Sequence, residues 1–402
     1  MKLAIFSDVY LDVPGGIVSS INAQKEGLEK AGHEVVIFSP GFAGRKREPG
    51  VYVVPTCKVL RLNKAPVAHR PGIVEKWILK QFPDFGKEFD LVHVHYEAGC
   101  SIAGMRLAKK YGITLVQTMH GREDSALAVN IPHPFKTLVG TLLNWFHSWY
   151  LPHKITVRRD DYLATTIGRA KMWTMMVNHA SYADLVLTPS YHLREKLRHY
   201  GVKTPMQVLS NGINDSLMQP EVQARILNPG DTIKILSNAR ISHEKRFMVF
   251  LEALTCLKIP YEVHAYGDGN ELKKAMRYVK RHKLNVKFYG LQKREVILAK
   301  MMECHLSVLA SYNFDNQPMT LLEAELAGLP VFICDPDMKE VVAEGGYLLA
   351  NGPSAKQMAG ALDYLYKHPE MVKKMSETMI AHRKEVLQSE KIKGLLQIYK
   401  AQ

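Results

Sequence analysis

The sequence predicts an α/β protein with two doubly wound domains in tandem. Short, almost continuously apolar segments alternate with segments of helical periodicity, and this alternation starts again after Gly212. Apolar strands separated by helices are typical of a parallel sheet that is covered on both faces. The length of 402 residues agrees with two or three domains of about 100–200 residues each. We therefore expect a first domain at residues 1–208, a second at residues 209–380, and a charged helical segment at residues 381–402 that could cross back to the first.

In the first domain, five strand-like segments mark the expected sheet. They cover residues 2–7, 35–39, 90–95, 114–119 and 185–188. Helices are predicted between the strands, over residues 17–31, 101–111 and 192–200. Gly32 directly follows the first of these helices, at the position where a left-handed cap is expected.

In the second domain, the strand-like segments return at similar spacing. They cover residues 233–237, 261–265, 286–289, 306–309 and 331–334. Helices are predicted over residues 270–282 and 294–302, and a further helix is predicted to begin at Pro318 and to end at Gly328.

One long insert interrupts the pattern, at about residues 122–182 of the first domain. It interleaves aromatic and basic side chains and contains three of the four tryptophans. Its apolar run is too short to span a bilayer, but the composition suits a surface that sits among lipid headgroups. The residues predicted to face an acceptor or a membrane here are Trp145, Trp149, Arg158, Arg159 and Trp173. The alternative is a helical insert that packs on the core or on another subunit.

Composition is that of a soluble globular protein, with 47% apolar and 23% charged residues. No apolar stretch reaches the ~18 residues of a membrane-spanning helix, and we expect no secretory signal. Five cysteines are scattered without a C-x-x-C pair, which indicates isolated thiols in a reducing cytosol rather than a disulfide framework or a zinc site. The net charge of +14 favours an anionic partner, although solubility alone could explain it.

The segment after the strand at residues 306–309 predicts an anion site. A polar loop leads to Pro318 at the start of a helix, where a missing N–H is tolerated. Free backbone N–H groups around Met319 and Thr320 would point out of the helix end, which suits a diphosphate. Glu323 falls inside the same helix and could accept hydrogen bonds from the hydroxyls of a sugar.

An ordinary helix capped by Asp315 or Asn316 would explain that segment equally well. A second segment favours the ligand site. Arg240 and Lys245 follow the first strand of the second domain, at the sheet edge where such domains bind ligands, and we expect both side chains to be exposed. A planar guanidinium and a compact ammonium suit two phosphate groups of one ligand. The alternative is a solvated basic loop.

Two further motifs are weaker evidence for a functional site. Asp335-Pro336-Asp337 lies in a turn after a strand, so we interpret it as turn chemistry and predict no metal or other cofactor. His93 and His95 alternate on one strand and could line the site, although hydrogen-bonded core histidines are the commoner case.

Several motifs together resemble glycosyltransferase family 4, whose members are retaining enzymes of the GT-B fold. The resemblance covers residues 1 to about 370 and includes the order and spacing of the motifs. In the second domain they are Asn211-Gly212-Ile213-Asn214, Arg240-x4-Lys245, Gly267-Asp268-Gly269, Asp315-x7-Glu323 and Gly328-Leu329-Pro330-Val331. In the first domain they are Phe6-Ser7-Asp8, Gly15-Gly16, Gly32-His33-Glu34-Val35, Thr118-Met119-His120-Gly121 and the run from Ala183 to Ser190.

The resemblance implies catalytic roles for four residues. Arg240 and Lys245 would hold the diphosphate of a nucleotide sugar and stabilise the charge of the leaving group without a metal. Asp315 matches the first acid of the family's E-x7-E motif, near the donor sugar, and His120 matches a histidine beside the transferred sugar. The family usually has Glu where this chain has Asp315, so the donor contacts could differ.

The resemblance also implies binding residues. Gly15 and Gly16 would form the loop that lets the diphosphate approach the backbone, and Glu323 would bind the ribose hydroxyls. Asp8 is assigned to the acceptor. The remaining donor-binding residues are Gly267, Asn316, Gln317, Met319 and Thr320. The implied fold is two Rossmann-like domains that face each other across a cleft, the first for the acceptor and the second for the nucleotide sugar.

These observations predict a retaining transferase that moves a hexose, most simply glucose from UDP-glucose, to a membrane lipid such as diacylglycerol or a glycolipid. The implied location is the cytoplasm, peripherally on the inner face of the cell membrane, with an anionic membrane surface as partner. A soluble, polysaccharide or protein-linked glycan acceptor stays open. A non-catalytic nucleotide-binding subunit is disfavoured by the intact site residues. A nucleic-acid-binding protein is supported by charge alone, so we predict no nucleic-acid partner.

Overall fold

The computed structural model describes residues 1–9, 11, 16–42, 48–62 and 65–401. The chain divides into two compact units. Unit 1 contains Met1–Leu209 together with Ile392–Gln402, and unit 2 contains Ser210–Lys391. The last helix, α15 (Gln388–Lys400), therefore begins in unit 2 and ends in unit 1.

Unit 1 is built on a seven-stranded parallel sheet in the order β3-β2-β1-β6-β7-β8-β9. Its strands are β1 (Lys2–Phe6), β2 (Glu34–Ser39), β3 (Val51–Val53), β6 (Leu91–Val94), β7 (Thr114–Thr118), β8 (Leu185–Thr188) and β9 (Met206–Val208). A separate antiparallel pair joins β4 (Thr56–Leu62) and β5 (Ala65–Ala68). The reversal of strand order beside β1 makes this a doubly wound sheet.

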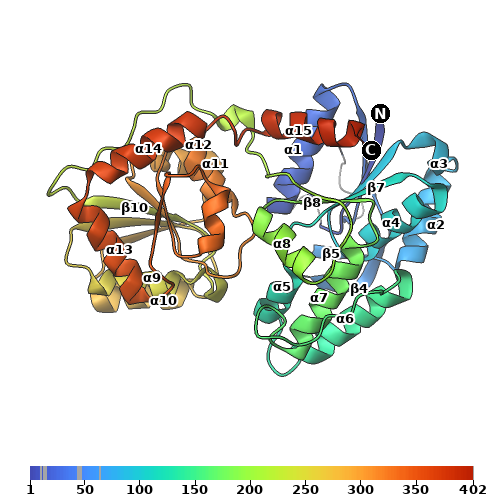
Figure 1. Ribbon diagram of the computed structural model, residues 1–402, viewed down its shortest axis with the longest axis horizontal. Helices are drawn as coiled ribbons and strands as arrows, with labels where there is room; N and C mark the ends of the chain where they lie inside the picture. The colour runs from blue at the N-terminus through green and yellow to red at the C-terminus, as the bar shows by residue number, and fades with distance from the viewer. Residues whose placement is uncertain (10, 12–15, 43–47, 63–64, 402) are drawn as a thin grey trace. The chain divides into compact units, whose positions relative to one another are not determined.

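Strand side chains alternate between two buried faces of this sheet. Leu3 and Ile5 point to a face covered by α1 (Gly16–Lys30) and the distant α15, which lie side by side (Figure 1). Ala4 and Phe6 point to the opposite core. The helices around that second core are α2 (Pro71–Gln81), α3 (Phe85–Glu88), α4 (Gly99–Tyr111), α7 (Ile167–Ala180) and α8 (Tyr191–His199).

Unit 2 repeats the plan with a six-stranded parallel sheet in the order β12-β11-β10-β13-β14-β15. Its strands are β10 (Ile233–Asn238), β11 (Tyr261–Tyr266), β12 (Val286–Gly290), β13 (Leu306–Leu309), β14 (Val331–Ile333) and β15 (Tyr347–Leu349). Its α-helices are α9 (Phe247–Cys256), α10 (Leu272–His282), α11 (Arg294–Met301), α12 (Met319–Leu326), α13 (Ala355–Lys367) and α14 (Glu370–His382). Short 3₁₀ turns lie at Asp215–Leu217 (η1), His243–Lys245 (η2) and Pro336–Val341 (η3).

The insert of unit 1 consists of α5 (Glu123–Asn130), α6 (Lys136–Tyr150), an extended loop and α7 (Figure 1). Helices α6 and α7 cross where both have a glycine. A Cβ on Gly140 would lie 2.9 Å from the carbonyl oxygen of Gly168, and one on Gly168 would lie 2.9 Å from that of Lys136. The close approach of the two backbones fixes α6 on α7, and α7 is buried in the core of unit 1.

The strands predicted from the sequence are all present, each within about two residues of its expected bounds. Gly32 has the left-handed φ of 83° that its place after α1 predicts. Five strands were not predicted from the sequence: β3, β9 and β15, which lie at sheet edges, and β4 and β5 of the antiparallel pair. No helix among the described residues is long and apolar enough to cross a membrane.

Candidate functional site

The loop after β10 carries the two cations predicted to bind a diphosphate. The Arg240 side chain is 65% exposed and forms an ion pair with the buried Glu244 at 3.5 Å. Glu244 also accepts a hydrogen bond from Ser242 at 2.6 Å, which anchors it. Arg240 is therefore held by its own loop, with its guanidinium largely open to solvent.

Lys245 lies differently, because its side chain is only 15% exposed. Its ammonium forms an ion pair with Asp315 at 2.5 Å. The other carboxylate oxygen of Asp315 accepts a hydrogen bond from Ser311 at 2.5 Å. The expectation that both cations are exposed is correct for Arg240 and wrong for Lys245. The structure instead joins two predicted site residues, 70 positions apart, in one partly buried pair.

The N-terminus of α12 leaves backbone donors available, as predicted. Pro318 is the cap residue immediately before the helix, and no side chain caps it, so neither Asp315 nor Asn316 does so. Within the described part of the chain, the N–H groups of Met319 and Thr320 have no acceptor, and the buried Thr320 hydroxyl has no partner. Donors of this kind at a helix N-terminus favour an anion.

Glu323 is 4% exposed and has two partners. One carboxylate oxygen pairs with Nε of Arg294 at 2.9 Å, and the other accepts a hydrogen bond from Asn238 at 2.9 Å. Burial raises the pKa of Glu323, while the Arg294 charge and these hydrogen bonds oppose the rise. Neither Arg294 nor Asn238 was among the residues predicted for the site.

Gly267 has a left-handed φ of 123° and lies against the loop that carries Arg240. A Cβ at this position would come within 2.2 Å of the carbonyl oxygen of Ala239. A Cβ on Gly269 would come equally close to the carbonyl oxygen of Ile241. These glycines therefore let the β11 and β10 loops pack together, which explains the Gly-Asp-Gly motif without a direct ligand contact.

Gln317 holds the loop before α12 rather than projecting from it. Its amide oxygen accepts hydrogen bonds from the backbone N–H of Asn211 at 2.7 Å and from the Asn211 side chain at 2.9 Å. Its amide nitrogen donates to Ser210 at 2.7 Å. The predicted turn at Asp335 is confirmed, since its carboxylate accepts from the N–H groups of Asp337 and Asn313.

In unit 1, His120 follows β7 and His95 follows β6, so both lie at the same edge of the sheet. His95 Nδ1 and His120 Nε2 are 2.9 Å apart. His93 is hydrogen-bonded on both ring nitrogens, to Tyr399 at 2.6 Å and to Thr118 at 2.7 Å. Burial lowers the pKa of His93 to about 3 and that of His120 to about 4, so both rings are neutral near pH 7.

Carboxyl groups not predicted for the site lie near these histidines. Glu123 Oε1 would be 3.6 Å from a Cβ on Gly121, which is the neighbour of His120. Tyr96 donates a hydrogen bond to Glu123, and burial with the nearby Asp124 raises the pKa of Glu123 to about 7. Glu97 is 6% exposed, and burial together with Glu123 raises its pKa well above the ordinary value. Their place directly after β6 and β7 is the signal that could have identified them.

Asp8, predicted to contact an acceptor, has a structural role in addition to that prediction. Its carboxylate accepts hydrogen bonds from the backbone N–H groups of Ala98, Cys100 and Ser101 at 3.2, 2.6 and 3.1 Å. It therefore caps the N-terminus of α4, where a carboxylate also complements the helix dipole. Gly15 lies outside the described residues, and Gly16 is the first residue of α1.

The predicted surface residues of the insert separate into two groups. Trp145 and Trp149 on α6 are 52% and 66% exposed, and their rings lie 4.6 Å apart. Arg158 and Arg159 are exposed in the following loop. Trp173 is fully buried, so its prediction as a membrane-facing residue is wrong. It packs on Tyr200 in the core of unit 1, because nearly every position of α7 is enclosed.

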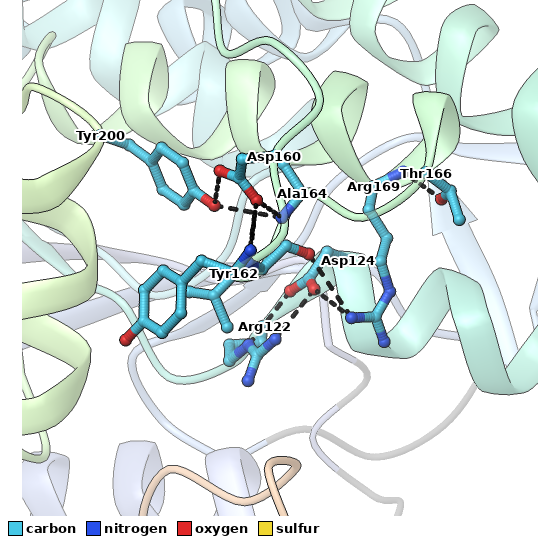
Figure 2. A network of polar contacts seen from close by, with 9 residues as sticks. Arg122, Asp124, Asp160, Tyr162, Ala164, Thr166, Arg169 and Tyr200 are labelled. Atoms are coloured by element: carbon cyan, nitrogen blue, oxygen red, sulfur yellow. Dashed lines mark hydrogen bonds and ion pairs between the residues drawn. The ribbon is translucent and has the colours of Figure 1, made fainter.

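Polar contacts fix the base of the insert (Figure 2). Arg122 and Asp124, both almost completely buried, form an ion pair at 3.0 Å, and Arg169 of α7 approaches the same carboxylate at 3.6 Å. Asp160 accepts from three backbone N–H groups of its own loop and from the Tyr200 hydroxyl at 2.7 Å. Through Tyr200, which lies outside the insert, these contacts join the insert to the core of unit 1.

Comparisons with known proteins agree with this arrangement. The model of "Glycosyltransferase Family 4" matches residues 14–217, and that of "Glycosyl transferases group 1" matches residues 218–382. An alpha-monoglucosyldiacylglycerol synthase of Acholeplasma laidlawii is 24% identical in an alignment that covers 94% of this chain and 91% of that protein. The enzyme of the same name from Streptococcus pneumoniae is 24% identical over 90% of this chain and 75% of its own length.

Solved structures show the same fold at lower identity. A sucrose-phosphate synthase of Thermosynechococcus elongatus superimposes with a TM-score of 0.70 at 15% identity, covering 100% of this chain and 98% of that one. Anabaena HepE, solved in complex with UDP, also gives a TM-score of 0.70, at 14% identity and complete coverage of both chains. With a family model that matches half of its length, the chain belongs to glycosyltransferase family 4 and has the GT-B fold.

Proposed function

We propose that this glycosyltransferase is a retaining enzyme that moves a hexose, most simply glucose from UDP-glucose, to a membrane lipid such as diacylglycerol or a glycolipid. The observation that carries the proposal is the donor side of unit 2, where a partly buried Lys245–Asp315 pair precedes an uncapped helix N-terminus. The names of the matched relatives and the UDP complex of HepE support the same substrate classes.

The donor would bind in unit 2, through its diphosphate. Departure of a nucleoside diphosphate places negative charge on phosphate oxygens, and fixed donors aimed at that charge lower the barrier. The exposed guanidinium of Arg240 and the free N–H groups of Met319 and Thr320 supply such donors. Lys245 would exchange part of its contact with Asp315 for a phosphate oxygen. No metal is needed for this chemistry, so we propose a metal-independent reaction.

The sugar and the ribose would be held by the carboxylates of the same unit. Asp315 would accept hydrogen bonds from hydroxyls of the donor sugar once Lys245 turns to the phosphate. Glu323 is held by its contacts with Arg294 and Asn238, and would accept hydrogen bonds from the ribose hydroxyls. We retain Gly267, Asn316 and Gln317 as residues that shape this site.

The acceptor hydroxyl would be received by unit 1. His120 is neutral near pH 7, so it can accept or donate a hydrogen bond without adding charge. Glu97 and Glu123 lie at the same sheet edge and are suited to bind uncharged hydroxyl groups. Like-charge repulsion would disfavour an anionic group at this place.

A lipid acceptor requires contact with a membrane, and helix α6 supplies a surface for it. Its exposed apolar residues recur at helical spacing, as expected for a helix that lies in the interface. They are Phe135 just before the helix, then Leu138, Leu142, Trp145 and Trp149, each more than half exposed. With Arg158 and Arg159 nearby in the chain, we propose a peripheral attachment to an anionic membrane at the inner face of the cell membrane.

Two alternatives stay open. A soluble, polysaccharide or protein-linked glycan acceptor would leave the α6 surface for another subunit. A non-catalytic nucleotide-binding subunit would bind UDP without product formation.

Product analysis separates these possibilities. The protein is incubated with UDP-glucose, UDP-galactose or UDP-N-acetylglucosamine, with and without vesicles that contain diacylglycerol and an anionic phospholipid. We expect a glycosylated lipid with UDP-glucose and vesicles. Donor consumption with soluble glycan only would refute the lipid acceptor, and UDP binding without any product would refute catalysis.

A further inference from the structure

We infer that unit 2 carries its own docking surface for an anionic lipid bilayer, on the outward side of helix α10. This surface is separate from α6 of unit 1, and the inference builds on the proposed lipid acceptor. We call it the basic face and define it as Lys273, Arg277, Lys280 and Arg281. All four side chains are exposed.

The geometry of α10 gathers these cations on one side. Ala275 is buried, and Leu272 and Val279 pack partly against the core of unit 2 beside α9. At 3.6 residues per turn, the four residues of the basic face occupy a sector of about 100° opposite that apolar side. The surface is therefore a property of the folded helix rather than of scattered charges.

No acid neutralises the basic face. Helix α10 contains five Lys and Arg residues and no Asp or Glu. The adjacent Glu271 pairs with Lys274 at 3.2 Å. Among the described residues, no member of the basic face takes part in an ion pair. By contrast, α1 pairs two lysines with glutamates one turn away, and α4, which also lacks acids, pairs two of its cations with acids of other elements.

This arrangement works against the helix itself. Lys273 and Arg277, and Arg277 and Arg281, are like charges four residues apart, a spacing that destabilises a helix. Lys283 then follows at the C-terminal cap with a left-handed φ of 52°, where glycine would be less strained. Solubility would be served as well by mixed charges, so the arrangement favours a role that needs an uncompensated positive surface.

The shape of the surface favours a bilayer over a small anion or a nucleic acid. Lys273 and Arg281 are separated by about 12 Å along the helix, and the side chains diverge from a convex face. A single phosphate needs converging donors, whereas a charged plane does not. Met276, at 49% exposure, is an apolar side chain beside the basic face, while Tyr278 is partly buried and stacks on His282. An aromatic platform for nucleic-acid bases is therefore absent from the described face of this helix.

The test uses the full-length protein with two matched variants. The first changes the basic face to glutamine: Lys273→Gln, Arg277→Gln, Lys280→Gln and Arg281→Gln. The control makes the same change in net charge on α13 and α14: Lys356→Gln, Lys367→Gln, Lys373→Gln and Lys374→Gln. Both are also made with Trp145→Ser and Trp149→Ser, so that α6 does not mask the result.

Co-sedimentation is measured at low and at raised ionic strength with vesicles of equal parts phosphatidylcholine and phosphatidylglycerol, and with phosphatidylcholine alone. Each basic residue near an anionic surface contributes about fivefold to binding, so loss of all four should weaken it roughly 600-fold at low salt. The control should change it by about fivefold or less, through long-range charge alone. UDP binding should be unchanged in every variant, which verifies folding.

Equal losses in the two variants, or no loss in the first, would overturn the inference. So would unchanged vesicle binding together with loss of retention on random-sequence duplex DNA, which would make nucleic acid the partner. Glucosyl transfer to diacylglycerol in neutral detergent micelles is measured in parallel. Its absence in the parent protein would refute the proposed function, while vesicle binding would still decide the role of the basic face.

Discussion

Arg294 gives a specific test of the donor-site geometry. It contacts a Glu323 carboxylate that is 4% exposed, at 2.9 Å, and Asn238 contacts the other oxygen. Burial already raises the pKa of Glu323, and Arg294 is the largest influence opposing that rise. Replacing Arg294 with Met removes the opposing charge, so the pKa rises further and the neutral acid gains population near neutral pH.

The magnitude follows from the contact that is lost. A hydrogen bond to a charged partner contributes about 1.5–3 kcal/mol, and a neutral Glu323 is a poorer acceptor for ribose hydroxyls. We therefore expect UDP-glucose binding to weaken about 10- to 100-fold at pH 7. Because an acid with a raised pKa ionises as pH increases, part of the affinity should return when the pH is raised above 7. Calorimetric titration without acceptor measures this directly.

Lys293 provides the matched control. It precedes Arg294 in the chain, is exposed, and has no ion pair among the described residues. Lys293→Met therefore removes the same charge without touching Glu323 and should leave UDP-glucose binding unchanged. Equal effects of the two substitutions, or weakened binding in Arg294→Met that does not vary with pH, would refute the reasoning.

The remaining predictions concern both units. Arg240→Ala and Lys245→Ala should each slow transfer about 10²-fold or more. Lys245→Ala alone should also lower the urea midpoint, because it leaves the partly buried Asp315 carboxylate without its cation. Transfer should survive EDTA, and complete loss that magnesium or manganese restores would contradict a metal-independent mechanism. Trp145→Ser with Trp149→Ser should weaken vesicle co-sedimentation about tenfold and leave UDP binding intact. Burial raises the pKa of Glu325 to about 7 from its ordinary 4.5, so the folded state holds a proton that the unfolded chain releases. Stability should therefore fall by about 2–3 kcal/mol as pH rises between these values, and Glu325→Gln should flatten that slope in urea unfolding.

The fold could be predicted from the sequence because its central strands are buried on both faces and appear as apolar runs. The edge strands β3, β9 and β15 have three residues each and carry too little pattern to be recognised. The end of α15 in unit 1 depends on tertiary packing. Ile392 and Leu395 pack in the same core as α1, and the local sequence of α15 does not indicate this contact.

The site was predicted less completely, for physical reasons. Residue types near strand ends identified Arg240, Lys245 and Glu323, but not the partners that fix them. The Arg294–Glu323 pair joins two helices, and its members lie 29 positions apart, so no local spacing indicates it. Trp173 was misassigned because aromatic and basic residues surround it in sequence. The apolar residues all round α7 are the pattern of an enclosed helix, whereas those of α6 form a stripe.

The anomeric configuration of the lipid product tests the central claim most directly. UDP-glucose, in which the sugar is α-linked, is incubated with the protein and vesicles that contain diacylglycerol, and the extracted glycolipid is examined by proton NMR. The account predicts one glucosyl-diacylglycerol whose anomeric proton has the small coupling constant of an α-glucoside. A β-glucoside would contradict the retaining mechanism, and the absence of any glucosylated lipid, with glucose transferred to water or to a soluble glycan, would contradict the lipid acceptor.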